Sequence, residues 1–265
     1  VITDKLDHAS IIDGSLLSFG TMLRFNHNDM ENLEQVLKKI KGKNSLIVVD
    51  GIFSMEGDIA FLPQICELAA KYGSSVMVDE AHSLGVLGST GAGTAEHFGL
   101  TDQCDFVMGT FSKSLASVGG FIAADKQLIH YLKHKSRALI FSASMPPASA
   151  ASVLAALKVM RDEPERIEKL WENTNYMLQE FKAMGYDTGL SCTPVIPLHV
   201  GEMMTAFDMW KRLGEEGLFI NPVVPPAVPP NSCLIRTSFM ATHTREQLDF
   251  ALDKFHSIGK ELHII

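Results

Sequence analysis

The sequence predicts an α/β fold, with a mainly parallel sheet sandwiched by helices and a smaller C-terminal α+β domain. Short apolar runs at residues 45–50, 74–79 and 105–109 have the composition of strands that are buried on both faces. Between the first two runs, residues 62–72 have helical spacing of apolar positions and end at Gly73, a common residue after a helix. Repeated strand-helix-strand order is typical of parallel βαβ units.

The remaining elements follow from the same signals. Residues 119–125 predict a further strand of the large domain. Beyond residue 147 helices dominate, expected at 148–160, 165–184, 204–216 and 245–262, with strands at 194–200 and 232–239. The five prolines within 222–230 predict an extended loop. We therefore expect a large domain at 1–163 and a small domain at 164–265.

Composition excludes several classes of protein. The 265 residues carry a net charge of -8, which argues against nucleic acid as the main partner. No apolar run approaches the roughly 18 residues of a membrane span, so we expect a soluble protein. The four cysteines lie far apart and the histidines lack metal-ligand spacing, so neither a disulfide framework nor a metal site is predicted. A reducing compartment, the cytoplasm, fits best.

Polar residues follow three of the predicted strands. Asp50 ends the first, Asp79 ends the second, and Lys113 comes shortly after the third. Ligands of parallel sheets bind beyond the carboxyl ends of the strands. A lysine there can form an imine, and an aspartate can hold a protonated pyridine nitrogen, so these residue types suit a pyridoxal phosphate site.

Each of these residues also has a plain structural explanation. Lys113 can be a solvated surface residue, Asp79 can cap a turn, and His82 can be a buried histidine with satisfied hydrogen bonds. Their order along consecutive strand ends favours the site over these plainer explanations.

Distinctive motifs extend over nearly the whole chain. They are DHAS at 7–10, FNHND at 25–29, GIFSMEGD at 51–58, DEAHSLG at 79–85, GTFSKS at 109–114, FSASMPP at 141–147 and PPAVP at 225–229. Together they resemble the α-oxoamine synthases, which use pyridoxal 5'-phosphate to condense an amino acid with an acyl-CoA. The resemblance implies a fold-type I transferase that works as a homodimer with shared active sites.

The resemblance also implies roles for individual residues. Lys113 attaches the cofactor as an imine and later acts as the base at the substrate Cα. Asp79 pairs with the pyridine nitrogen, and His8 stacks on the ring. His82 and Ser54 donate hydrogen bonds to the phenolic oxygen of the ring. Lys113, His8, Asp79 and His82 are thus the predicted catalytic residues.

Three further roles come from the same resemblance. Thr110 binds the cofactor phosphate, and Ser142 or Ser144 of a neighbouring subunit reaches the same phosphate. Arg236 holds the carboxylate of the amino acid, for which the planar guanidinium is well suited.

Within the family, the segment Thr110–Lys113 with Val-Gly-Gly at 118–120 is most similar to members that use L-serine and a long-chain acyl-CoA, such as palmitoyl-CoA, in sphingolipid biosynthesis. The reaction expected is condensation with decarboxylation to an amino ketone. Members that use glycine with acetyl-CoA, or alanine with a dicarboxylic acyl-CoA, carry glycine in place of Ser112 and are the first alternative.

A plain aminotransferase and a non-catalytic partner subunit also stay open, although the presence of Lys113 argues against the latter. A long acyl substrate is compatible with weak peripheral contact with a membrane. Met203, Met204 and Met209 fit a helix core better than a groove for that acyl chain.

Family members are longer than this chain at the start. Their upstream segment supplies an arm, the first strand and a helix N-terminus that binds the cofactor phosphate. The resemblance therefore predicts that the N-terminal part is missing here.

Overall fold

The computed structural model describes residues 1–265, which divide into two compact units. The first unit consists of Val1–Phe53 and Ile59–Pro164, and the second of Ser54–Asp58 and Glu165–Ile265. The division after Pro164 lies one residue from the boundary that the sequence predicts. No sequence signal indicates that Ser54–Asp58 belongs to the second unit.

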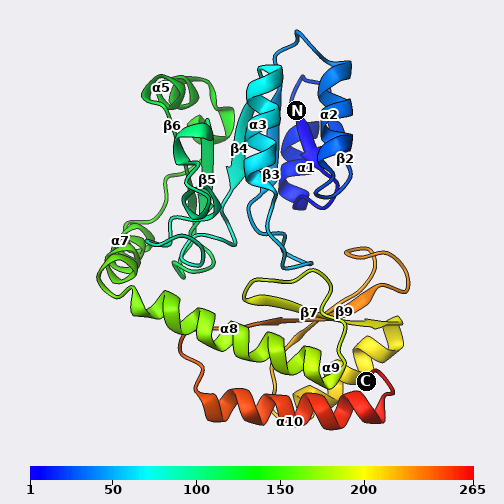
Figure 1. Cartoon of the computed structure of the whole chain (residues 1–265). Helices are drawn as coiled ribbons and strands as arrows, with labels where there is room; N and C mark the ends of the chain where they lie inside the picture. Colours follow the sequence, from blue (N-terminus) through cyan, green and yellow to red (C-terminus); the bar gives the residue numbers. More distant parts are fainter. The chain divides into compact units, whose positions relative to one another are not determined.

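Six strands form the sheet of the first unit, in the order β2-β1-β3-β4-β5-β6 (Figure 1). They are Ile2–Asp4 (β1), Leu23–Phe25 (β2), Leu46–Asp50 (β3), Ser75–Asp79 (β4), Phe106–Thr110 (β5) and Gly120–Ala124 (β6). All neighbouring pairs are parallel except β5 and β6, which are antiparallel. The predicted, mainly parallel sheet is confirmed. The sequence pattern misses β1 and β2, because three-residue strands are too short to show periodicity.

Helices surround this sheet: Ala9–Leu16 (α1), Met30–Lys39 (α2), Leu62–Tyr72 (α3), Thr94–His97 (α4), Lys126–Lys135 (α5), Arg137–Ile140 (α6) and Pro147–Asp162 (α7). In Figure 1, α2 and α3 lie side by side across the sheet. Leu33 and Leu37 of α2 and Ile65 of α3 pack with the strands in one hydrophobic core. The carboxylate of Asp29 caps α2 by accepting the Asn32 N–H at 2.9 Å.

The second unit has an antiparallel sheet with strand order β7-β9-β8. Its strands are Val195–Gly201 (β7), Asn221–Val223 (β8) and Cys233–Ser238 (β9), and its helices are Glu165–Met184 (α8), Met203–Glu215 (α9) and Arg245–Glu261 (α10). The helices lie along one face of the sheet (Figure 1). Side chains such as Phe181, Ile196, Met209 and Phe255 fill the core between them. No helix of either unit is long and apolar enough to cross a membrane.

Two expectations for the second unit are wrong. Pro222 does not lie in a loop but in β8, opposite Ile235 of β9. Proline is tolerated there because β8 is an edge strand, whose outward N–H needs no partner in the sheet. Met203 and Met204 are not in the core but 46% and 70% exposed, and only Met209 of the three is buried.

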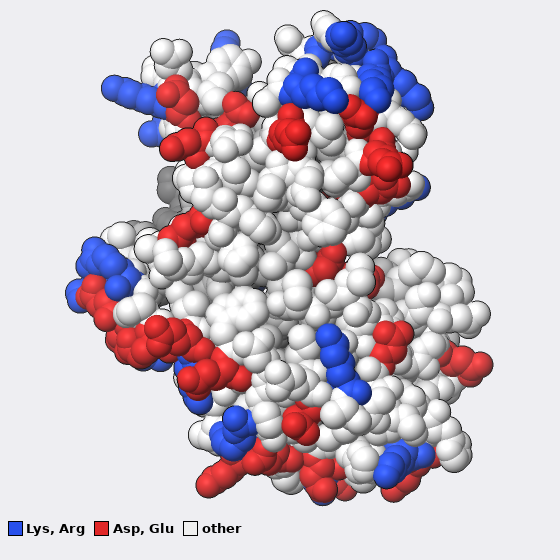
Figure 2. Space-filling model, viewed as in Figure 1, with Lys and Arg blue, Asp and Glu red and all other residues white.

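Positive charge gathers over α2 and the loop after it (Figure 2). Lys38, Lys39, Lys41 and Lys43 are exposed there. Lys38 and Lys39 lie in the last turn of α2, where cations stabilise the negative end of the helix dipole. The cluster is a local exception in a chain whose net charge is negative.

The segment Ser54–Asp58 is anchored in the second unit through Gly57. The Gly57 carbonyl accepts hydrogen bonds from Cys192 N at 3.1 Å and Thr193 Oγ1 at 2.8 Å. Gly57 has a φ of +68°, and a Cβ atom there would overlap the carbonyl oxygen of Val195. Both the conformation and the close approach therefore require glycine.

We expect Gly57→Ala to lower the free energy of unfolding by about 3 kcal/mol, because backbone overlap adds to the strain of a positive φ. Urea unfolding measures this loss. Gly42→Ala is the matched control, since Gly42 has a φ of +83° but no atom close to the added Cβ. Strain alone predicts a loss of about 1 kcal/mol for the control. Equal losses in the two variants would contradict the role of Gly57.

Candidate active site

Three neighbouring parallel strands, β1, β3 and β4, each end on an aspartate: Asp4, Asp50 and Asp79. Asp50 and Asp79 lie directly opposite each other in register. The three residues are 1%, 3% and 6% exposed, respectively. The carboxyl edge of the sheet therefore carries a row of buried carboxyl groups.

Backbone N–H groups donate hydrogen bonds to carboxyl groups at this edge. Asp4 accepts hydrogen bonds from Leu6 N at 2.8 Å and Asn28 N at 2.9 Å. Asp7, which is also buried, accepts from Asp4 N at 2.7 Å and from Asp50 N at 2.9 Å. Burying a carboxyl group without such donors would be costly, so the backbone around the row is fixed by it.

Two carboxyl groups at this edge, those of Asp7 and Asp50, have pKa values raised to near neutral pH. Burial raises the pKa of Asp7 to about 8, and the charge of Asp50 adds to this effect although backbone hydrogen bonds oppose it. Burial, together with the charge of Asp79, raises the pKa of Asp50 to about 7, against the lowering effects of the His8 N–H and of Lys113. Crowded buried carboxyl groups cannot all ionise at once.

Two other predicted site residues, Lys113 and His8, interact electrostatically with Asp79. Burial raises its pKa, whereas a hydrogen bond from Ala81 N at 2.9 Å and the charges of Lys113 and His8 lower it. The Lys113 amine and the His8 imidazole therefore lie close enough to interact with this carboxylate. The structure thus brings Lys113, Asp79 and His8 together.

Lys113 is exposed and lies in the loop between β5 and β6. Backbone hydrogen bonds close this loop: Phe111 N donates to Gly119 O at 2.9 Å, and Ser117 N donates to Phe111 O at 2.8 Å. Thr110 Oγ1 lies 2.9 Å from Ser112 Oγ and donates to Gly119 O at 3.3 Å. The lysine is thereby held on a defined turn.

His82 lies in the turn after β4 and is half-buried. The neighbouring Glu80 is fully buried and fixes this turn, because its carboxylate accepts the N–H groups of Thr94 at 2.7 Å and Ala95 at 2.8 Å. Ser83 Oγ also donates to Glu80. No sequence pattern predicts this role of Glu80, although two glycines, Gly51 and Gly93, leave room for its carboxylate.

Ser142 and Ser144 are exposed, on the segment between α6 and α7. No hydrogen bond links either hydroxyl to Thr110. Their predicted contribution to the phosphate site of a neighbouring subunit stays a prediction.

Ser54 and Arg236 meet within the second unit. Arg236, on β9, donates from Nε to the Ser54 carbonyl at 2.7 Å. Burial lowers the pKa of the Arg236 guanidinium. Its Nη groups make no hydrogen bond within the chain, so they can still bind a carboxylate in two-point fashion.

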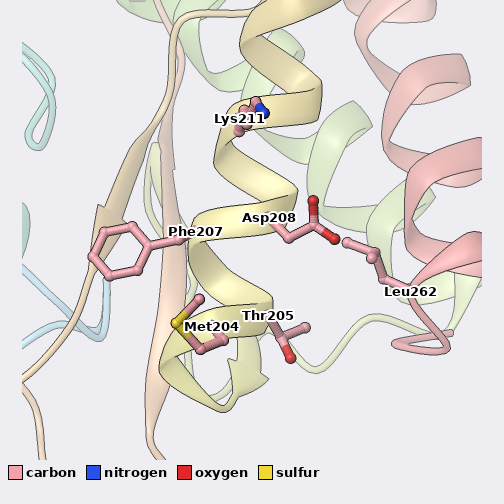
Figure 3. Close-up of a pocket in the computed structure, with 6 residues that line it drawn as sticks. All are labelled: Met204, Thr205, Phe207, Asp208, Lys211 and Leu262. Atoms are coloured by element: carbon pink, nitrogen blue, oxygen red, sulfur yellow. The ribbon is translucent and has the colours of Figure 1, made fainter.

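The pocket shown in Figure 3 has a volume of about 490 Å³ and lies on α9 and the chain after α10. Its lining consists of Met204, Thr205, Phe207, Asp208, Lys211 and Leu262, none of which is a predicted site residue. Asp208 is already paired through both oxygens with Arg212, each at 2.9 Å. The carboxylate in this pocket is therefore already neutralised by an ion pair.

The residues around Asp79 fit pyridoxal phosphate. The Asp79 side chain is largely buried, and only its Oδ1 accepts a hydrogen bond from the chain, so Oδ2 is available to a protonated ring nitrogen. Lys113 supplies the amine for covalent attachment, and the hydroxyls of Thr110 and Ser112 are suitable donors for a phosphate.

Comparisons with known proteins agree with this chemistry. Residues 1–255 match the family described as aminotransferase class I and II. A serine palmitoyltransferase from Bacteroides ovatus is 52% identical over 100% of this chain and 68% of its own length. An 8-amino-7-oxononanoate synthase from Thermoanaerobacter pseudethanolicus is 44% identical over 100% of this chain and 68% of its own.

A solved structure, the serine palmitoyltransferase of S. paucimobilis with a bound PLP–myriocin aldimine, has a TM-score of 0.96 and 36% identity. The match covers 100% of this chain and 67% of that one. The chain thus spans about two thirds of the length of these relatives.

The buried row predicts how stability depends on pH. The folded-state pKa values of Asp7 and Asp50 are raised above the unfolded value near 3.8, so the folded protein binds more protons between these limits. This contribution to stability is complete at low pH and is lost as pH rises through the folded-state values of about 7 and 8. We therefore expect the free energy of unfolding of the cofactor-free protein to fall between about pH 5 and pH 8.

Urea unfolding at a series of pH values measures this slope. Asp50→Asn removes one titrating group, so the fall becomes shallower by up to about 1.4 kcal/mol per pH unit. Asp102→Asn, at an exposed position, serves as the control and keeps the original slope. The same slope in Asp50→Asn and in the unchanged protein would show that Asp50 is ionised throughout.

Proposed function

The chain belongs to the aminotransferase class I and II family and, within it, to the α-oxoamine synthases, and from this membership we propose that it condenses L-serine with a long-chain acyl-CoA such as palmitoyl-CoA. The convergence of Lys113, Asp79 and His8 carries this proposal. It occurs in a chain that is 52% identical with a serine palmitoyltransferase and 44% identical with an 8-amino-7-oxononanoate synthase. The higher identity favours serine among the amino acids that the family uses.

The chemistry divides between the cofactor and the protein. Bound pyridoxal phosphate supplies an electron sink for negative charge at the substrate Cα. Lys113 would hold the cofactor through Nζ and would supply the amine that takes the Cα proton. Asp79 would keep the ring nitrogen protonated through its carboxylate. Water is largely excluded at Asp79, so this ion pair would be stronger than one at the surface.

Arg236 binds the serine carboxylate through its free Nη groups, while the bond from Nε to Ser54 O keeps the guanidinium plane fixed. In the net reaction a bond forms between Cα and the thioester carbon, and the carbon–sulfur bond breaks to release CoA. The bond from Cα to the carboxylate then breaks, releasing carbon dioxide, and Cα takes up a proton to give the amino ketone.

We also propose a cytoplasmic homodimer in which Ser142 or Ser144 of one subunit reaches the phosphate site of the other. Their exposure on the segment before α7 supports this role. A long acyl substrate is consistent with weak peripheral contact with a membrane.

A second candidate uses alanine and a dicarboxylic acyl-CoA, as an 8-amino-7-oxononanoate synthase does. The 44% identity with such an enzyme supports this candidate. Glycine with acetyl-CoA differs only in the substrates, so the same assay distinguishes all three.

The cofactor lysine provides the first test. Lys113→Ala removes the amine, so we expect no cofactor to stay covalently bound after borohydride reduction and denaturation. CoA release should fall by at least about 10³-fold, because attachment and proton removal are both lost. Lys126→Ala, at an exposed lysine of α5, is the matched control and should behave like the unchanged protein. Normal CoA release by Lys113→Ala would refute the proposal.

Substrate choice is tested by CoA release with serine, glycine and alanine in turn, each with palmitoyl-CoA, acetyl-CoA and a dicarboxylic acyl-CoA. Serine with palmitoyl-CoA should give the highest kcat/KM. A higher value for alanine with the dicarboxylic acyl-CoA would establish the second candidate. Loss of the amino group to the cofactor without any need for acyl-CoA would identify an aminotransferase.

Arg236→Ala should raise the KM for the amino acid by about 100-fold, because a charge-assisted two-point contact is lost. The value of kcat should change much less, since the contact is present in the ground state as well as in the transition state. Steady-state kinetics at varied serine concentration measure both values. Arg212→Ala, which breaks a surface ion pair, is the control. An unchanged KM in Arg236→Ala would remove this residue from the substrate site.

A further inference from the structure

His8 is held from two sides at the start of α1. Its ring Nδ1 accepts the Ser10 N–H at 3.2 Å and lies 2.9 Å from Ser10 Oγ, so the imidazole caps the helix. From the buried side, Asp50 Oδ2 accepts the His8 backbone N–H at 2.7 Å. The imidazole itself is exposed, whereas the carboxyl group that holds its backbone is buried.

The bond from His8 N to Asp50 ties the start of α1 to a distant part of the chain. His8 is the N-cap residue of α1, and its N–H, which has no partner within the helix, is satisfied by a carboxyl group 42 residues away. Where other helices of this chain are capped by acidic side chains, Asp29 and Asp125 do so from positions that are not buried. The Asp50 bond therefore fixes where the chain enters α1, and with it the place of the His8 ring.

Asp50 is well placed for this task because it is itself immobilised. It ends β3, inside the sheet between β1 and β4. Its N–H donates to Asp7 Oδ1 at 2.9 Å, and Asp7 Oδ2 accepts from Asp4 N at 2.7 Å. A continuous chain of hydrogen bonds thus runs from the end of β1 through β3 to the start of α1.

The same carboxyl group faces the cofactor residues. Asp50 lies in register with Asp79 on the adjacent strand, and it interacts electrostatically with Asp79 and Lys113. His8 in turn interacts with Asp79. A shift of Asp50 would therefore move His8 relative to the two residues that hold the cofactor.

We propose that Asp50 is a positioning residue of the active site, which places His8 against the cofactor by holding its backbone N–H. The role assigned to Asp50 rests on the proposed function only as far as cofactor binding, and it does not depend on which amino acid is the substrate.

The test compares three variants of the purified protein with added pyridoxal phosphate. Asp50→Ala deletes the acceptor for His8 N–H, and the affinity for the cofactor should fall about tenfold or more. Asp50→Asn keeps an amide oxygen in reach of that N–H, so its affinity should stay within about threefold. Asp105→Ala is the matched control, because Asp105 makes an equivalent bond to Val76 N at 2.8 Å at the opposite end of the strands.

Two readouts separate positioning from general stability. Absorbance titration gives the cofactor Kd, and visible circular dichroism per bound cofactor reports how rigidly the ring is oriented. We expect Asp50→Ala to lose at least about half of this dichroism, while Asp105→Ala and Asp50→Asn keep it. If Asp50→Ala does not fold, Asp50→Ser, whose hydroxyl is too short to reach His8 N, takes its place.

A double-mutant cycle shows whether Asp50 acts through His8. In a His8→Ala background, replacing Asp50 by Ala should change the cofactor Kd by no more than about twofold. Full dichroism and an unchanged Kd in Asp50→Ala, or equal losses with and without His8, would overturn the proposal. Failure of the unchanged protein to bind pyridoxal phosphate would instead refute the proposed function.

Discussion

The burial of several carboxyl groups at one edge of the sheet is the constraint on which the site depends. Asp4, Asp50 and Asp79 end three adjacent strands, and each ionised group in this row raises the cost of ionising the next. Hydrogen bonds from backbone N–H groups, protonation of Asp50 and the positive charge of Lys113 offset that cost. The turns after these strands are shaped by the donors they must supply, and the residues of the cofactor site lie on or beside those turns.

The sequence predicts the central part of the fold well because its elements are long enough to show a period. Helix α8 begins and ends at the predicted residues, and β3, β4 and β5 lie within one residue of their predicted positions. Strands β1 and β2 escape detection since three residues show no alternation. The prediction of a loop at Pro222 is wrong because proline fits a strand at the edge of a sheet. Edge position is a property of the folded sheet and not of the local sequence. Met204 fits the helical pattern, yet its side of α9 stays exposed.

In the candidate site, too, the sequence predicts features that depend on local patterns and misses those that depend on long-range contacts. Lys113, Asp79 and His82 are found from strand ends and motifs, which are local features of the sequence. The bonds from Asp7 to Asp50 and from Asp50 to His8 join residues 43 and 42 positions apart, and no local pattern reports such contacts. Ser54 follows directly after the first unit's Phe53 yet belongs to the second unit, because Gly57 bonds to the chain at residues 192–193.

The buried carboxyl groups beside the site reduce the stability of the folded chain as pH rises through neutrality, where Asp7 and Asp50 must ionise. Asp79 is buried opposite Asp50, and burial, to which neighbouring negative charges add, raises the pKa of Asp50 to about 7 and that of Asp7 to about 8. A cationic ring nitrogen beside Asp79 would favour the ionised carboxylate, and its binding to the folded chain would raise the stability of that chain. The buried carboxyl groups therefore favour a positively charged ligand at Asp79, which Lys113 lies close enough to influence.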